Sequence, residues 1–146
     1  MNGRRTKSIA VRRAGAVVAR RGAVSHARQK FGKFGEDFAC RELERRGYVI
    51  LERRYRRRGG EIDIIARDGQ TTVFVEVKSR DGHEFGEAGE AVTAIKRRRL
   101  TAVALDFLAR EGLTERACRF DVVSIHMENE LPVVEIYRNA FDAVTF

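Results

Sequence analysis

Residues 60–78 read GEIDIIARDGQTTVFVEVK, and this stretch decides the fold of the chain. Apolar residues alternate with other residues on both sides of Asp68-Gly69, a dipeptide that strongly favours a hairpin turn. The alternation predicts two antiparallel strands over residues 61–66 and 72–78. The residues expected on the shared apolar face are Ile62, Ile64, Ala66, Val73, Val75 and Val77.

The register of this hairpin brings charged residues together. Opposed residues of an antiparallel pair have a constant sum of positions. A turn centred between residues 69 and 70 places Asp63 opposite Glu76, whereas a turn formed by residues 68 and 69 makes them diagonal neighbours. Strand side chains alternate between faces, so Asp63, Glu76 and Lys78 share one face in either register.

Two opposed carboxylates, at about 4.5–5.5 Å between Cβ atoms, repel each other unless a cation lies between them. Hard oxygen ligands favour Mg²⁺ or Mn²⁺, so Asp63 and Glu76 are the predicted metal ligands. Lys78 would point towards the attacking water or the phosphate, and Glu36, in a predicted helix, would complete the catalytic set as a third acidic group. The alternative interpretation is that Glu76 and Lys78 form a solvated charge pair on one strand face. Glu61 is a further candidate ligand, but a role as partner for Lys78 or for an arginine is favoured.

Basic residues directly precede this hairpin and are the predicted nucleic-acid contacts. They are expected to hold a phosphate backbone, and the tyrosine among them is placed to stack on a base. The predicted contacts are Arg53, Arg54, Tyr55, Arg56, Arg57, Arg58 and, from a second basic cluster, Lys96. Residues 97–99 of that second cluster are better explained as the solvated face of a helix.

The rest of the chain supplies the other elements of an α/β fold. A helix is expected from Phe34 to about residue 46, ended by Gly47, and a short buried strand over residues 48–51 with a polar connection after it. A long amphipathic helix is predicted over residues 93–110, and two strands over 120–125 and 133–137. The apolar positions of the helix over residues 93–110 are Ile95, Leu100, Val103, Ala104, Phe107 and Leu108. The predicted order is α-β-β-β-α-β-β.

Charge divides the chain into two parts. Residues 1–33 contain ten of the 29 Lys and Arg residues and none of the 21 Asp and Glu residues. We therefore predict a basic, disordered extension over residues 1–30, with at most a short helix, and a single domain over residues 31–146. The extension suits a polyanion, since each cation near a phosphate releases a counterion. The alternatives are a solubilising extension, a wrongly chosen start codon or an organelle transit peptide without a marked cleavage site.

Several classes of protein are excluded by the composition. No apolar run approaches the ~18 residues that a membrane span needs. Cys40 and Cys118 lie far apart without metal-ligand spacing and are predicted to be buried free thiols, which indicates a reducing cytoplasm. The three histidines are scattered, so no cofactor other than the Mg²⁺ or Mn²⁺ ion is expected.

Four motifs in order resemble one known family. GEIDIIARDG, VFVEVKSR, FGEAGEAV at residues 85–92 and RFDVV at residues 119–123 together resemble the YraN family of small bacterial proteins. That family is of largely uncharacterised role and is similar in fold to restriction endonucleases and archaeal Holliday-junction resolvases. The resemblance covers residues 31–137 and implies a restriction-endonuclease-like core with a mixed central sheet flanked by helices.

The resemblance also implies roles for particular residues. The Asp…Glu-x-Lys signature of that nuclease superfamily corresponds to Asp63, Glu76 and Lys78, and the helical glutamate of the resolvase branch corresponds to Glu36. The chain differs from the family pattern at Arg54, where family members often have an asparagine. This difference affects the predicted substrate contacts and not the predicted metal site.

Two functions follow as hypotheses. The first is a Mg²⁺-dependent nuclease that hydrolyses phosphodiester bonds of DNA, including branched or structured DNA; cleavage of two strands would favour a homodimer. The second is a non-catalytic nucleic-acid-binding or adaptor module on the same fold, since fold alone does not establish function. A more distant option is a scaffold that binds a partner through the helix over residues 93–110.

Overall fold

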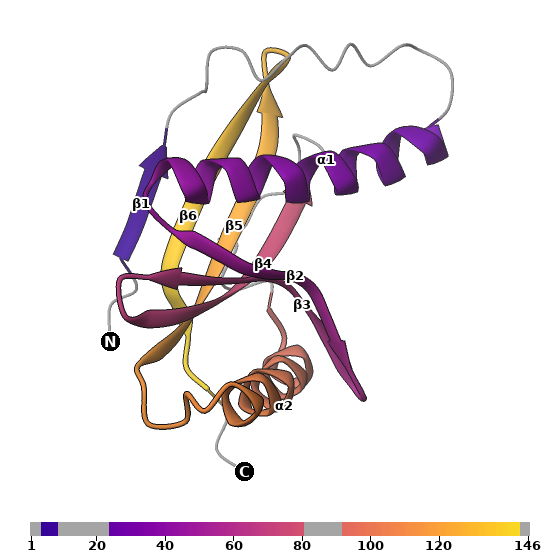
Figure 1. Cartoon of the computed structure of the whole chain (residues 1–146). Helices are drawn as coiled ribbons and strands as arrows, with labels where there is room; N and C mark the ends of the chain where they lie inside the picture. The colour runs from indigo at the N-terminus through magenta and orange to yellow at the C-terminus, as the bar shows by residue number, and fades with distance from the viewer. Residues whose placement is uncertain (1–3, 9–23, 81–91, 144–146) are drawn as a thin grey trace.

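The computed structural model describes residues 4–8, 24–80 and 92–143. A six-stranded mixed sheet runs through it in the order β1-β6-β5-β4-β3-β2, with α1 on one face and α2 on the other (Figure 1). The helices are α1 (Val24–Arg45) and α2 (Ala94–Arg110). The strands are β1 (Arg4–Ser8), β2 (Val49–Arg57), β3 (Gly60–Asp68), β4 (Thr71–Arg80), β5 (Cys118–Glu128) and β6 (Leu131–Phe141).

From α1 onwards, the predicted order α-β-β-β-α-β-β and the mixed sheet are confirmed. β4 and β5 are parallel and are joined through α2, whereas the other neighbouring strands are antiparallel. A parallel pair needs such a crossover connection, because its strands start at the same end of the sheet.

The beginning of the chain differs from expectation. Residues 4–8, for which no regular structure was expected, form β1 and pair with β6, with Lys7 opposite Glu135. Backbone pairing with an edge strand leaves little apolar pattern in the sequence, so periodicity did not indicate it. α1 also begins at Val24, well before the predicted start at Phe34. Residues 9–23 of the predicted extension lie outside the described residues.

The hairpin formed by β3 and β4 has the first of the two predicted registers. Ile64 pairs with Val75 and Asp68 with Thr71, so residues 69 and 70 form the turn. Gly69 has a φ of 60°, a left-handed conformation that glycine adopts without a steric penalty. The same constant sum places Asp63 opposite Glu76, one step beyond the last regular pair.

One residue of the predicted apolar face lies on the other side of the sheet. Ile64, Ala66, Val73 and Val75 pack under α1 as expected, but Ile62 packs in the core under α2. The regular ladder between β3 and β4 stops at Ile64, whereas β3 continues to pair with β2. β3 therefore twists away from β4 near Asp63, and the simple alternation fails there.

β2 is longer than predicted. The polar connection expected after residue 51 is wrong up to Arg57, because that stretch pairs with β3. A register shift between Ile50 and Glu52 places the extra residue Leu51 in a bulge, and Val49 and Leu51 are exposed rather than buried. Bulges of this kind break the alternation that sequence patterns depend on.

The predicted helix over residues 93–110 is confirmed with one exception. α2 buries Leu100, Val103, Ala104, Phe107 and Leu108, but Ile95 is 68% exposed because it lies in the first turn. Cys40 is buried as predicted, whereas Cys118 is exposed at the start of β5, which corrects its prediction. Within the described ranges, neither helix combines the length and apolar character that crossing a membrane requires.

Candidate metal and nucleic-acid site

Asp63 lies where β3 separates from β4. Its Oδ2 accepts a hydrogen bond from the backbone N–H of Val77 at 2.8 Å. Burial and the negative charge of Glu76 raise the pKa of the Asp63 carboxyl from 3.8 to about 7, although the Val77 hydrogen bond opposes that rise. The predicted juxtaposition of these two carboxyl groups is therefore present in the fold.

Glu76 is the more deeply buried of the pair, with 7% of its surface exposed. Its Oε1 accepts a hydrogen bond from the ammonium of Lys96, in the first turn of α2. That turn is fixed by Thr93, whose Oγ1 accepts a hydrogen bond from the Lys96 backbone N–H at 3.2 Å. Lys96, predicted as a nucleic-acid contact, thus contacts Glu76, one of the two predicted metal ligands. Lys78 lies two residues after Glu76 on β4 and is half-buried.

Glu36 approaches the same region from α1. It pairs with Arg54, whose Nη2 lies 3.0 Å from Glu36 Oε2, and Arg54 lies opposite Asp63 in the β2–β3 ladder. The negative charge of Glu36 contributes to the raised pKa of Asp63. In the part of the chain that the structure describes, however, no three acidic, histidine or cysteine side chains come close enough together to hold one ion.

Two glycines bring the helices close to the carboxylates. A Cβ added at Gly35 in α1 would overlap Ser79 Oγ on β4, one residue beyond Lys78. A Cβ added at Gly60 would lie 3.1 Å from Val103 Cγ2 on α2. Each glycine therefore lets one helix pack directly on the strands that carry the site. For Gly35, the signal in the sequence is a glycine inside a helical pattern.

We expect Gly35→Ala to lower the free energy of unfolding by about 1–3 kcal/mol, because the new methyl group overpacks against Ser79. In a Ser79→Ala background the same change should be neutral or stabilising by up to about 1 kcal/mol, since alanine favours helix over glycine. Urea unfolding of the four proteins in this double-mutant cycle measures the coupling. Additive effects would show that the α1–β4 contact does not need glycine.

The donor set fits a hard divalent cation. Mg²⁺ is usually held by one or two protein carboxylates together with waters and substrate phosphates, so a third protein ligand is not required. Asp63 and Glu76 supply two such carboxylates whose mutual repulsion a cation would relieve. These two residues would hold Mg²⁺ or Mn²⁺, with Glu36 as an outer acidic group.

A second charged cluster lies at the far end of the same strands, around Arg119 of β5. Its guanidinium donates to Asp121 Oδ1 at 3.0 Å, Asp68 Oδ2 at 2.8 Å and the Tyr48 hydroxyl at 3.0 Å. Asp121 is 0% exposed and also accepts a hydrogen bond from the Asn139 backbone N–H at 2.9 Å. This network links β3, β5 and β6, and it accounts for the RFDVV motif as a structural feature.

Comparison with known proteins identifies the family of this chain. Residues 35–125 match the family described as "Uncharacterised protein family UPF0102". The chain belongs to the UPF0102 family. The resemblance to YraN, another name of the family, is thereby confirmed.

UPF0102 relatives are similar over most of their length. A UPF0102 protein of Geobacter metallireducens is 46% identical over 78% of this chain and 93% of its own length. A UPF0102 protein of Symbiobacterium thermophilum is 50% identical over 66% of this chain and 82% of its own. A solved structure of Pyrococcus furiosus SfsA in complex with Ca²⁺ is 18% identical, with a TM-score of 0.38; the match covers 76% of this chain and 63% of that protein.

The predicted nucleic-acid contacts of this UPF0102 chain are largely paired within the protein. Besides the Arg54–Glu36 pair, three arginines have acidic partners at 2.6–3.0 Å, and Arg58 is exposed. The pairs are Arg53–Asp37, Arg56–Glu61 and Arg57–Asp106. An arginine partner for Glu61 agrees with one of the two predicted alternatives. A phosphate would have to compete with these carboxylates.

Tyr55 is not available to stack on a base, which corrects its predicted role. It is 5% exposed, and its hydroxyl donates to Asp106 Oδ2 at 2.7 Å. The guanidinium of Arg57 covers its ring at 4.4 Å from the centroid, and Phe107 packs edge-on against it. The second half of β2 was expected to be a polar connection, so burial of this ring could not be predicted from local pattern.

Arg54 also departs from usual backbone geometry. Its φ of 52° lies in the left-handed region, where asparagine is much more common than arginine. The asparagine that the YraN resemblance implies at this position is therefore explained by the backbone. With arginine at this position, the guanidinium of Arg54 donates to the carboxylate of Glu36, which the shorter side chain of an asparagine would not reach.

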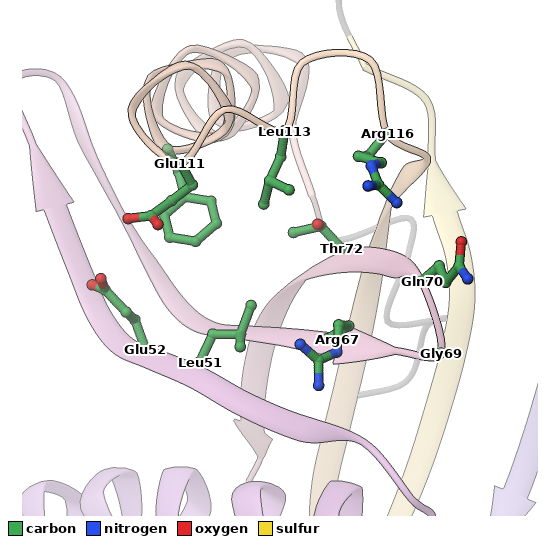
Figure 2. A pocket seen from close by; sticks show the side chains of 10 residues that line it. Leu51, Glu52, Arg67, Gly69, Gln70, Thr72, Glu111, Leu113 and Arg116 are labelled. Atoms are coloured by element: carbon green, nitrogen blue, oxygen red, sulfur yellow. The ribbon is translucent and has the colours of Figure 1, made fainter.

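A hollow lies on the α2 side of this UPF0102 fold, away from Asp63 and Glu76 (Figure 2). Glu52 and Glu111 lie at one end, Arg67 and Arg116 at the other, and Leu113 projects between them. Glu111 follows α2, whereas Lys96 is in its first turn, so the helix rise separates them by about 22 Å. None of the predicted site residues lines this hollow.

Proposed function

We propose that this protein is a Mg²⁺- or Mn²⁺-dependent nuclease that hydrolyses phosphodiester bonds of DNA, including branched or structured DNA, on a restriction-endonuclease-like core. The observation that carries the proposal is the juxtaposition of half-buried Asp63 and buried Glu76, where the charge of one carboxyl raises the pKa of the other. Carboxyl groups that repel each other and have perturbed pKa values are typical of sites that bind a cation or transfer a proton. The half-buried Lys78 follows on the same strand.

Each residue has a distinct part in this proposal. Asp63 and Glu76 hold the ion, Lys78 orients the attacking water and neutralises the phosphate, and Glu36 supplies an outer negative charge. When bound, the ion supplies Lewis-acid stabilisation of the charge that develops on the phosphate. The water oxygen gives up a proton to solvent and forms a bond to phosphorus, the ester P–O bond breaks, and the leaving oxygen takes up a proton from solvent. Cleavage of both strands would favour a two-fold homodimer.

The test is cleavage of linear, flapped and four-way DNA by the purified full chain in Mg²⁺ or Mn²⁺. We expect Glu76→Gln to lower the cleavage rate at least about 100-fold, because loss of a metal ligand removes several kcal/mol of transition-state stabilisation. The matched control is Glu115→Gln, the same change at an exposed residue beyond α2, and it should cleave like the wild type. Equal cleavage by Glu76→Gln would point to a contaminating nuclease, and no cleavage by any protein would reject the proposal.

The second candidate is a non-catalytic nucleic-acid-binding or adaptor module. The observation that favours it is the Lys96–Glu76 ion pair, which neutralises the buried carboxylate without a metal ion. This function predicts salt-sensitive DNA binding that requires the basic residues 1–33 and is unaffected by Glu76→Gln. Binding of that kind, without heat of Mn²⁺ binding in a calorimetric titration, would favour it over the nuclease.

A further inference from the structure

Lys96 and Glu76 form an unequal pair. The carboxylate of Glu76 is buried, whereas 41% of the Lys96 side chain is exposed. Removing the partner of a buried charge is costly, so Glu76 needs a cation at all times. The lysine side chain reaches in from solvent and supplies that cation.

The backbone of Lys96 is fixed while its side chain is long. Thr93 caps the turn, and Gly60 lets α2 pack against β3 through Val103. Lysine has a flexible four-carbon stem, so the ammonium can leave Glu76 without any movement of α2. Because 41% of the side chain is already exposed, a displaced ammonium would lie in solvent, where a nucleic acid would approach.

A divalent cation and the Lys96 ammonium would compete for the same carboxylate. The ammonium donates to Glu76 Oε1, and a second positive charge at this carboxylate would be repelled strongly in a partly buried site. We propose that Lys96 is a resident counter-ion of Glu76 that the metal ion displaces, and that the displaced ammonium then contacts a phosphate of the nucleic acid. The proposal rests on the metal-dependent nuclease function and adds an order of events to it.

Two consequences follow. Lys96 lowers the affinity of the site for the metal ion, because the ion has to replace an existing charged hydrogen bond. Lys96 also contributes to DNA binding only after the metal ion has bound, because before that its charge is engaged by Glu76. The ion pair therefore couples metal binding to substrate binding.

The first experiment compares Lys96→Met with Arg99→Met, which removes the same charge from an exposed position on the same helix. Calorimetric titration with Mn²⁺ should show about tenfold tighter binding to Lys96→Met than to the wild type. Arg99→Met should stay within about twofold, since it removes only a screened surface charge. Equal Mn²⁺ affinity of Lys96→Met and the wild type would overturn the proposal while leaving the metal site intact. Absence of binding to every protein would reject the metal site and the proposal together.

The second experiment measures DNA binding by fluorescence anisotropy, with Lys78→Met in every protein so that the duplex is not cut. In EDTA, adding Lys96→Met should change the DNA affinity by less than about twofold. In Mn²⁺ the same substitution should weaken binding about three- to tenfold, as expected for loss of one phosphate contact. An equal loss in both conditions would show that Lys96 contacts DNA independently of the metal ion and would overturn the proposed order.

Discussion

Arg119→Met should lower the free energy of unfolding by about 3–5 kcal/mol, because it leaves a buried charge without its partner. Asp121 is fully buried, and burial raises the pKa of its carboxyl while hydrogen bonds from Asn139 and Arg119 oppose that rise. Without the guanidinium, Asp121 keeps only the backbone hydrogen bond from Asn139 among the partners that the structure describes. Chemical denaturation at pH 7 measures the loss.

A second variant separates charge from packing. Arg119→Met combined with Asp121→Leu removes both buried charges, and apolar replacement of a buried pair is often neutral or stabilising. We therefore expect the double variant to regain at least half of the lost stability. Arg116→Met, an exposed arginine just before β5, is the matched control and should change stability by less than about 0.5 kcal/mol. A loss of similar size in the control would show that the network is not the cause.

Asp63→Asn should stabilise the metal-free protein by roughly 2–4 kcal/mol at pH 8 and by much less at pH 4. The pKa of Asp63 is raised from 3.8 to about 7, and one pKa unit corresponds to about 1.4 kcal/mol. A raised carboxyl pKa means that the folded state binds more protons than the unfolded state between these pH values. Stability is therefore lost as the pH rises from about 4 to 7, and asparagine avoids that loss.

Urea unfolding in EDTA at the two pH values measures this difference, with Asp142→Asn at an exposed position as the control. Added Mn²⁺ should reverse the order at pH 8, because a ligand that binds the folded state stabilises it and Asp63→Asn lacks one of the two carboxylates. A stability gain that is equal at both pH values would mean that Asp63 carries its ordinary charge in the folded protein.

The hairpin and the pairing of its carboxylates could be predicted because they depend on neighbours in the chain. Asp68-Gly69 indicated a turn, and the constant sum of positions then left two registers, both of which put Asp63 and Glu76 on one face; the structure has the register in which they oppose each other. Asp63 and Glu76 were placed correctly for that reason. The long helix was equally accessible, since its buried positions repeat at helical spacing.

The errors concern residues whose environment is set by distant parts of the chain. Tyr55 is buried because α2 brings Asp106 and Phe107 to it, about fifty positions along the sequence. Ile62 faces α2 because β3 leaves β4, and no local pattern marks that divergence. Lys96 reaches Glu76 only because α2 crosses from β4 to β5 over the sheet. Such contacts require the tertiary arrangement, which alternation and spacing do not determine.

The edge of the sheet has a consequence for synthesis on the ribosome. β1 is translated before the other strands of the sheet, but it pairs with β6, which is translated after them. The backbone groups of residues 4–8 therefore have no strand to join until β6 has left the exit tunnel. Domains generally fold as units during translation, and in this sheet the pairing of β1 has to wait for the synthesis of β6, which lies between β1 and β5. A stalled or truncated chain that lacks β6 would leave both β1 and the β5 edge unpaired and prone to aggregation.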